Sequence, residues 1–256
     1  MGVKTKINKK DLQSLLKIKS LQATKHGVSD SVYIINNKYI LKIFENSSKK
    51  TLSEEIKLLQ KLKPLQVTKL KNKIFNIKEK PALLYKKSKG KSVDNIKKIH
   101  IKQIAKFLKT FHTLTKGCKS KNKNIFSKSL LQSMVEKSNK KSFQKLYQSI
   151  NIELKNDGII HGDIFRDNVL FKKDKLKVVI DFSEACNGDF YFDLGVIALD
   201  WCKNNHQIQI LLQSYGTSLT LKEFKPYIKY AGLYYILIRY FDNRDYKKLL
   251  KRIKKL

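Results

Sequence analysis

A short acidic stretch in the middle of this chain has residue types that can carry out chemistry. In "HGDIFRDNVLF", Asp163 precedes Asn168, and a second apolar run, "KVVIDF", places Asp181 near its end. A lysine-rich turn separates the two runs, so residues 169–181 are expected to form strand, turn and strand, with Asn168 and Asp181 at one end of the hairpin. Carboxylate and amide oxygens are hard ligands that suit Mg²⁺, with phosphate oxygens completing its coordination shell. Asp163 is placed to accept a proton from an attacking hydroxyl.

The first part of the chain contains several further candidate strands. Two β-rich runs cover residues 32–35 and 39–44, and the Asn36-Asn37 pair between them suits a tight turn with positive φ. The apolar spacing over residues 47–62 predicts a helix, because it repeats with the helical period. The other elements expected here are a helix over residues 9–19, strands over residues 73–77 and 82–85, a cap from Ser47 or Ser48, and a helix end at Pro64.

From residue 95 onward the pattern is mainly helical. Residues 101–114 place apolar side chains on one broad face, and residues 127–150 are expected to form a second, weaker amphipathic helix. The last third also has helical spacing, with breaks expected near Gly216 and Pro226. We therefore expect an α+β chain, with a small β-rich domain over residues 1–86 and a larger helical domain over residues 87–256.

The net charge of +34 is typical of proteins that bind nucleic acid. Only four of the 55 basic residues are arginine, although bidentate contacts with bases and phosphates favour arginine. The lysines are spread along the whole chain, and Asn and Ile are abundant too, so a drift in composition explains the charge better. We expect no specific nucleic-acid partner, and a basic nucleic-acid-binding protein is the alternative that is not an enzyme.

Cysteine usage and the apolar runs point to the reducing cytoplasm. The three cysteines form no Cys-x-x-Cys pair, so neither a disulfide framework nor a zinc cluster is expected. The N-terminal segment lacks the apolar region of a secretory signal. The longest strongly apolar run, near residues 233–238, is too short to span a bilayer, so no membrane association is expected. We expect a monomer or a homodimer.

The order of the three site residues resembles the protein-kinase-like fold, in which H-x-D-x-x-x-x-N is followed by a strand that ends in Asp-Phe. The "HGD" form is similar to the small-molecule branch of that fold, the aminoglycoside phosphotransferase and choline kinase group. The resemblance implies a bilobal fold, ATP and Mg²⁺ as cofactors, and transfer of the γ-phosphoryl group to a hydroxyl of a small molecule. It implies that Asp163 is the catalytic base and that Asn168 and Asp181 hold Mg²⁺.

The same resemblance assigns an ATP site to the N-terminal lobe. Lys42 lies inside the apolar run "YILKIF", where an unpaired ammonium group would be costly. The resemblance implies that Lys42 binds ATP phosphates and pairs with a glutamate of the following helix. Glu55 falls within the apolar stripe of that helix and Glu54 falls opposite, so we favour Glu55. The alternative is that Lys42 faces solvent on an exposed face of the sheet.

Two loops complete the ATP site that the resemblance implies. "HGVSDS", at residues 26–31, would cover the phosphates with Ser29 and Ser31, although it has one glycine where protein kinases have three. "KPALLYKKSKGKS" resembles the hinge between the lobes. Backbone groups of Leu84 and Lys86 would hold the adenine there.

Further runs narrow the resemblance to homoserine kinases of this fold. These runs are Phe165-Arg166-Asp167, Ala185-Cys186-Asn187, Asp193-Leu194 and Asp200-Trp201-Cys202. They imply L-homoserine as the acceptor and a role in threonine biosynthesis. A choline or ethanolamine kinase is the second choice, since an aromatic cage for choline is an alternative to core packing for the tyrosines of residues 227–240. An aminoglycoside kinase is the third, because residues 203–256 contain only three acids to bind a polycation.

Several residues around the predicted site keep two readings each. Arg166 either contacts a substrate carboxylate or braces the loop. Glu184 and Asn187 either line the acceptor pocket or belong to a solvated turn. Asp193 is expected to brace the catalytic loop through His161 rather than to touch the substrate. The expected structural residues are Asp174 in a solvated turn, Trp201 in the core, and Cys186 and Cys202 as small buried side chains.

Overall fold

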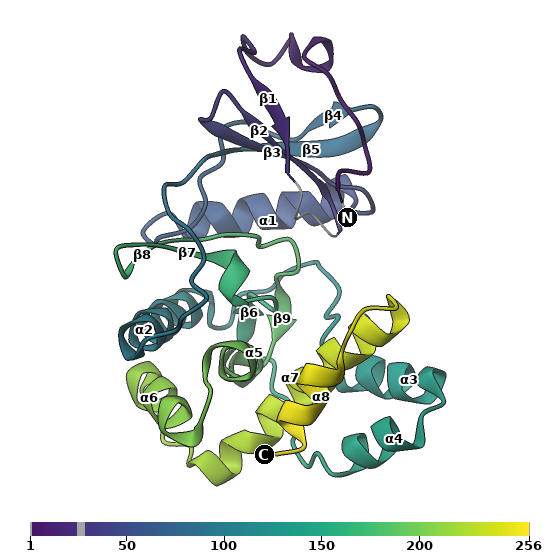
Figure 1. The fold of residues 1–256 in the computed structure, drawn as a ribbon, viewed down its shortest axis with the longest axis vertical. Coiled ribbons are helices and arrows are strands. Elements are labelled where there is room, and N and C mark those ends of the chain that lie inside the picture. The colour runs from purple at the N-terminus through teal and green to yellow at the C-terminus, as the bar shows by residue number, and fades with distance from the viewer. Residues whose placement is uncertain (1, 25–28, 256) are drawn as a thin grey trace. The chain divides into compact units, whose positions relative to one another are not determined.

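The computed structural model describes residues 2–24 and 29–255. The chain divides into two compact units, Met1–Lys89 and Gly90–Leu256 (Figure 1). A five-stranded antiparallel sheet dominates the first unit, and the second is mainly helical. The chain is therefore α+β, as the sequence predicts.

The sheet of the N-terminal unit has the strand order β1-β2-β3-β5-β4. Asn36 and Asn37 form the turn between β2 and β3 with φ of 53° and 52°, as predicted. The strand β1 was not predicted, because three residues are too few to show a period. The five strands are β1 Leu21–Ala23, β2 Ser31–Ile35, β3 Tyr39–Ile43, β4 Phe75–Ile77 and β5 Lys80–Lys86.

One face of this sheet packs against the N-terminal segment. Buried residues of β2 and β3 meet Leu12, with Leu15, Leu16 and Ile18 partly buried around them. The prediction of a helix over residues 9–19 is wrong, because only the 3-10 helix η1 (Lys10–Leu12) forms there. The helix α1 (Lys49–Lys61) was predicted, and Ser48 caps it by accepting a hydrogen bond from Thr51 N at 3.2 Å.

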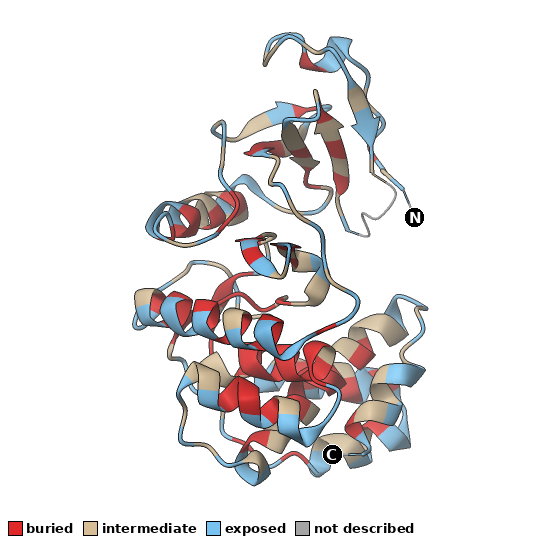
Figure 2. Cartoon of the chain, turned by 60° about the vertical axis from the view of Figure 1, so that its left-hand side comes forward, coloured by how far each residue is buried: buried red, intermediate tan, exposed pale blue. Residues whose placement is uncertain are grey.

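The C-terminal unit is built around α5 (Phe190–Trp201), whose residues are buried along most of its length (Figure 2). Helix α5 packs closely on α7, and a Cβ atom at Gly195 would lie 2.8 Å from the Tyr227 carbonyl oxygen. The other helices of this unit are α2 Lys98–Thr115, α3 Lys128–Ser138, α4 Lys141–Gln148, α6 Asn205–Tyr215, α7 Leu221–Phe241 and α8 Lys247–Ile253.

Two helix predictions need correction. Residues 127–150 form α3 and α4 instead of one helix, because Asn139 takes a left-handed conformation with φ of 52° and ends α3. The break near Gly216 is confirmed, since Gly216 caps α6 with φ of 82°. The break near Pro226 is wrong, because α7 continues through that residue and loses only one backbone donor.

Two short sheets carry the predicted hairpin and its neighbour. β7 (Val169–Lys172) and β8 (Lys175–Val179) pair antiparallel, directly after the 3-10 helix η2 (Arg166–Asn168). β6 (Gly158–Ile160) pairs with β9 (Cys186–Gly188). Within residues 2–24 and 29–255, no helix combines the length and the apolar character that a membrane crossing requires.

Candidate active site

The β7–β8 hairpin brings Asn168 and Asp181 to its open end. Val169 pairs with Val179, and Ile180 N donates to the Asn168 carbonyl at 2.9 Å. Asp181 has φ of 64°, a conformation that residues other than glycine rarely adopt. The Ser183 hydroxyl donates to Asp181 Oδ1 at 2.7 Å. This unusual backbone conformation is the kind of strain that tends to occur at functional sites.

Asp163 and Asn168 are joined directly. The amide nitrogen of Asn168 donates to the Asp163 carbonyl at 2.7 Å and to Asp163 Oδ2 at 2.9 Å. Both bonds use the amide nitrogen, so the amide oxygen of Asn168 points away from Asp163. One side chain therefore fixes the carboxylate of Asp163 and turns a hard oxygen ligand in another direction.

Asp193 on α5 holds the turn that precedes Asp163. Its carboxylate accepts from His161 N at 2.8 Å and from Gly162 N at 2.7 Å. The third bond joins it to His112 Nε2 of α2 at 3.1 Å. The Asp193 side chain is fully buried, and these three donors compensate for the loss of solvent. It contacts the backbone of the turn, which is the bracing role that we expected.

His161 has the tautomer that the turn requires. Asp163 N donates to Nδ1 at 3.2 Å, so Nδ1 is an acceptor and Nε2 donates to the Ile180 carbonyl at 3.1 Å. Burial lowers the pKa of His161, against the opposing effect of the Asp193 charge, so the ring is neutral. His161 thus links the turn of Asp163 to the strand end beside Asp181.

Negative charge accumulates around Asp163. Desolvation, followed by the charges of neighbouring carboxylates, raises the pKa of Asp163 to about 7, although the bond from Asn168 opposes the shift. The neighbouring carboxylates are Asp181, Glu184 and Asp167. A bound cation would balance this charge.

Two residues that were candidates for contact with the acceptor, Arg166 and Asn187, bind other groups of the protein. Arg166 binds Asp200 with its backbone nitrogen at 2.8 Å and with its guanidinium at 3.0 Å and 3.1 Å, so it braces the loop. The Asn187 side chain accepts from Ser120 N and donates to the Cys118 carbonyl, both at 2.8 Å. These contacts favour the reading in which Arg166 braces the loop, and they give the Asn187 side chain a structural role in place of a contact with the acceptor. Glu184 is exposed and near Asp163, and its contact with the acceptor stays a prediction.

The structural roles expected for the core residues agree with the structure, and the role expected for one turn residue, Asp174, does not. Trp201 is buried and donates to the Ile164 carbonyl at 3.2 Å. Burial raises the pKa of both Cys186 and Cys202 to about 12, so they are inert buried side chains. Asp174 is not merely solvated. Its carboxylate contacts Lys97 Nζ at 2.7 Å and His100 Nε2 at 2.9 Å, which ties the hairpin turn to α2.

In the N-terminal unit, Lys42 lies on β3 with 12% of its side chain exposed, so it does not face open solvent. Its ammonium group is 3.1 Å from Asp30 Oδ2. Glu55 is buried on α1, as the helical spacing predicts, and accepts a hydrogen bond from the Tyr85 hydroxyl at 2.8 Å. The pairing of Lys42 with Glu55 stays a prediction.

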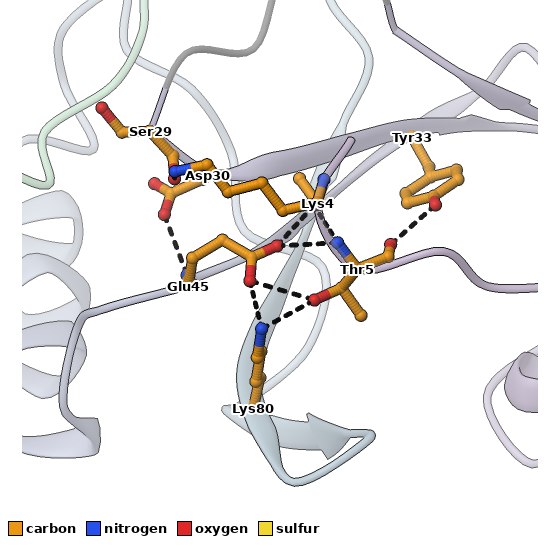
Figure 3. A network of polar contacts seen from close by, with 8 residues as sticks. Lys4, Thr5, Ser29, Asp30, Tyr33, Glu45 and Lys80 are labelled. Atoms are coloured by element: carbon orange, nitrogen blue, oxygen red, sulfur yellow. Dashed lines mark hydrogen bonds and ion pairs between the residues drawn. The ribbon is translucent and has the colours of Figure 1, made fainter. Parts of the chain in front are cut away.

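A polar network around Glu45 holds the C-terminal end of the predicted phosphate loop in place (Figure 3). The buried Ser31 hydroxyl donates to Glu45 Oε1 at 2.5 Å and accepts from Thr5 N at 2.9 Å. The Ser31 side chain is therefore engaged in the fold, and a phosphate contact from it is not supported. Ser29 is exposed, with its carbonyl 3.1 Å from Lys4 Nζ. Residues 26–28 of the predicted loop lie outside the described residues.

The backbone groups expected to hold adenine are used by the sheet. The Leu84 carbonyl accepts from Lys71 N at 2.7 Å, and Lys86 N donates to the Lys69 carbonyl at 2.8 Å. These bonds form because residues 69–71 run along the edge of β5 that faces away from β3. The Leu84 carbonyl and the Lys86 N–H are therefore not available to adenine, and a contact of adenine with the other backbone groups of these residues stays a prediction.

The donor set beside Asp163 fits a hard divalent cation. Asn168 offers an amide oxygen and Asp181 a carboxylate, which are the ligand types that Mg²⁺ prefers. Across residues 2–24 and 29–255, the structure contains no group of three or more His, Cys, Asp or Glu side chains placed to hold a metal ion. A cation here would complete its shell with phosphate oxygens and water, as Mg²⁺ does in nucleotide sites.

Four residues with clear contacts at these sites were not singled out from the sequence. Asp30 and Glu45 organise the region around Lys42, and Asp200 holds Arg166. Tyr235 of α7 places its hydroxyl 3.3 Å from Asp163 Oδ1. Their partners lie far away in sequence, so no local spacing indicates the contacts. The Asp-Trp-Cys run that carries Asp200 was the one available signal.

Comparison with known proteins agrees with this geometry. The phosphotransferase enzyme family, APH, matches the chain over residues 20–227. The chain belongs to this family. Among curated proteins, the phosphotransferase is similar to a homoserine kinase of Methylobacillus flagellatus, with 27% identity over 233 residues, covering 80% of this chain and 72% of the relative. A homoserine kinase of Methylobacillus glycogenes is 25% identical, with coverage of 80% and 72%.

Solved structures show the same fold. A choline kinase, LicA of Streptococcus pneumoniae, superposes with a TM-score of 0.73 at 16% identity, covering 97% of this phosphotransferase and 98% of that chain. The GDP complex of wild-type aminoglycoside 2'-phosphotransferase-IIIa gives a TM-score of 0.68 at 17% identity, with 95% of each chain covered. The protein-kinase-like fold predicted from the sequence is confirmed.

Proposed function

We propose that this phosphotransferase transfers the γ-phosphoryl group of ATP to a hydroxyl of L-homoserine. One observation carries the reaction type: Asn168 holds the Asp163 carboxylate, and Asp181 lies close enough to raise the Asp163 pKa. A base, a hard oxygen ligand and a second carboxylate in this order serve phosphoryl transfer. The names of the curated relatives support homoserine as the first acceptor to test.

In the proposed reaction, Asp163 accepts the proton of the acceptor hydroxyl. The hydroxyl oxygen bonds to the γ-phosphorus while the bond from that phosphorus to the bridging oxygen of ADP breaks. The products are ADP and the phosphorylated acceptor, and the proton passes from Asp163 to solvent. The chain contributes mainly orientation and charge stabilisation to this step.

Asn168 and Asp181 would hold Mg²⁺, and Lys42 would contact the phosphates of the nucleotide. Bound Mg²⁺ neutralises charge on the phosphates of the donor. Lys42 has a carboxylate, Asp30, beside its ammonium group, and a nucleotide phosphate can replace that anion. Ser29, through its backbone or its exposed side chain, is the remaining candidate of the predicted phosphate loop.

A choline-type acceptor is the second candidate, because Tyr235, which contacts Asp163, belongs to a group of packed aromatic rings. Tyr235 meets Phe165 edge to face at a centroid distance of 4.6 Å and meets Tyr234 at 5.2 Å. Aromatic faces with a nearby carboxylate, here Glu184, attract quaternary ammonium groups.

An aminoglycoside stays third, since the acids of residues 203–256 have structural partners. Glu223 caps α7 through Thr220, and Asp242 pairs with Arg244 at 2.6 Å. Asp245 accepts from Lys247 N at 2.9 Å. These contacts leave the C-terminal region without a group of acids placed to bind a polycation.

The test is an acceptor panel with ATP and Mg²⁺, in which products are identified by ³¹P NMR and mass spectrometry. The panel contains L-homoserine, choline, ethanolamine and two aminoglycosides. We expect O-phosphohomoserine as the main product. Phosphocholine instead would overturn the acceptor but keep the reaction type, and an unchanged panel with intact ATP would overturn both.

A further inference from the structure

Helix α7 reaches the turn that carries Asp163 through a single tyrosine. The Tyr235 hydroxyl donates to the Gly162 carbonyl at 2.5 Å and lies 3.3 Å from Asp163 Oδ1. In sequence, Tyr235 is one of several tyrosines on α7 and nothing sets it apart. The contact places a phenol hydroxyl directly beside the proposed base.

The turn is held from two opposite sides. Asp193 of α5 binds the N–H groups of His161 and Gly162, and Tyr235 of α7 binds the Gly162 carbonyl. Gly162 has φ of 81°, and a Cβ atom there would lie 2.3 Å from the ring of Phe126. Position 162 therefore requires glycine, and Tyr235 binds the turn on its carbonyl side.

The two oxygens of the Asp163 carboxylate have different neighbours. Oδ2 accepts from the amide nitrogen of Asn168 at 2.9 Å, and Oδ1 faces the hydroxyl of Tyr235. The terminal torsion of an aspartate is broad, so one bond alone leaves the carboxylate free to rotate. The Tyr235 hydroxyl shares its one hydrogen between the Gly162 carbonyl and Oδ1, and so it restricts that rotation at the oxygen not used by Asn168.

The environment keeps Tyr235 in a form that donates. Desolvation and the nearby charge of Asp163 hold the pKa of Tyr235 well above its usual value, so the phenol stays protonated. Its ring packs edge to face with Phe165 and with Tyr234, at 89° in both pairs. These contacts fix the ring, and therefore the direction of the hydroxyl.

We propose that Tyr235 is a positioning residue for phosphoryl transfer. Its hydroxyl holds the Gly162 carbonyl and orients Oδ1 of Asp163 toward the hydroxyl of the acceptor. The role rests on the proposed function, because it acts through Asp163 as the base. Small errors in the placement of a reacting group have large effects on rate, which is how one hydroxyl can matter here.

The first experiment replaces the hydroxyl and keeps the ring. Tyr235→Phe is expected to lower kcat by about tenfold or more, the size of one hydrogen bond to a charged group, with ATP affinity unchanged. The matched control is Tyr230→Phe on the same helix, since Tyr230 donates to the Phe126 carbonyl at 2.8 Å. We expect the control to lose similar thermal stability but to keep kcat within about twofold.

The second experiment is a double-mutant cycle with Asp163→Asn, measured by product formed over long incubations. If Tyr235 acts through Asp163, Tyr235→Phe changes the residual rate of Asp163→Asn by less than about twofold. An equal loss in both backgrounds would overturn the proposal, as would a kcat for Tyr235→Phe within twofold of wild type. A wild-type chain that phosphorylates no acceptor would overturn the proposed function itself, so the two failures are distinguishable.

Discussion

The charged groups of the two units are held in different ways. In the C-terminal unit, Asp163 follows a turn whose backbone is bonded to Asp193 and Tyr235, and its carboxylate is bonded to Asn168. In the N-terminal unit, the ammonium group of Lys42 is paired with the Asp30 carboxylate. The carboxylate that we propose as the base is thus held through the backbone of its own turn, which side chains of α5 and α7 bind. Under the proposed function, a phosphate of the nucleotide would replace the Asp30 carboxylate beside Lys42.

The N-terminal unit also contains a carboxylate, that of Glu45, which several hydrogen bonds hold in place. Glu45 binds Thr5, Ser31 and Lys80 with its carboxylate, and its backbone nitrogen donates to Asp30 Oδ1 at 3.0 Å (Figure 3). The side chain of Glu45 is only 4% exposed. The backbone nitrogen of Glu45 thus contacts Asp30, the partner of Lys42.

The largest effect is expected from Asp181, the proposed cation ligand of the C-terminal unit. Asp181→Asn removes a carboxylate at the strained residue after β8, and kcat/KM should fall on the order of a thousandfold. Raising the Mg²⁺ concentration should recover part of the loss, because the remaining ligands bind the cation more weakly. Steady-state kinetics over a Mg²⁺ titration measure both effects, and an activity near wild type at low Mg²⁺ would refute the ligand role.

The next effect concerns the charge of Glu45 in the N-terminal unit. Burial acts to raise the pKa of Glu45, but bonds from Lys80, Ser31 and Thr5 outweigh it and lower the pKa to about 2. The folded state therefore gains stability from this group above about pH 4.5, and the gain is lost as the pH falls toward about 2. Its full size is at most about 3 kcal/mol.

This prediction is checked by urea unfolding of wild type and Glu45→Gln at about pH 6 and about pH 3. The gap between the two proteins should shrink at the lower pH. Glu79→Gln, at an exposed turn of the same unit, is the control and should unfold like wild type. A gap that does not change with pH would contradict the role of the Glu45 charge.

A smaller effect is expected from Asp200, which binds Arg166 in the loop after Asp163. Asp200→Asn weakens the bonds to the backbone and side chain of Arg166, so kcat should fall by about tenfold while ATP affinity is retained. The matched control is Asp242→Asn, which breaks the exposed pair with Arg244 and should leave kcat unchanged. Equal kcat values for the two variants would show that the Arg166 pair does not position the loop.

The smallest effect is expected at the ion pair of Asp30 and Lys42, where we propose that a phosphate replaces the carboxylate. Asp30→Asn keeps an oxygen that can accept from Glu45 N but removes the charge beside Lys42. The KM for ATP should fall by about threefold with kcat unchanged, because the phosphate no longer competes with a carboxylate. A KM that rises instead would mean that Asp30 orients Lys42 for the nucleotide.

The sequence predicted the parts of the fold that depend on local pattern. The Asn36-Asn37 turn, α1 and the β7–β8 hairpin follow from residue periods and turn chemistry within short windows. The helix over residues 9–19 failed because its apolar residues pack individually on the sheet, and tertiary contacts outweigh helical spacing.

The residues of the candidate site also differ in whether a local sequence pattern could predict them. Asp163, Asn168 and Asp181 lie close together in sequence, so a motif could identify them. The neighbours that hold the two sites, Tyr235, Asp200 and Glu45, approach from distant segments, and only the fold brings them into contact. Ser31 and Asn187 show the converse, since their loop positions indicated ligand contacts but their side chains are bonded within the protein.

The most direct test of the central claim compares acceptor-dependent ADP release by wild type and Asp163→Asn at saturating ATP and Mg²⁺. Wild type should release ADP when L-homoserine or another accepted hydroxyl compound is added. Asp163→Asn should bind ATP normally but turn over on the order of a thousandfold more slowly. Turnover close to wild type in Asp163→Asn would contradict the assignment of Asp163 as the base and, with it, this account of the site.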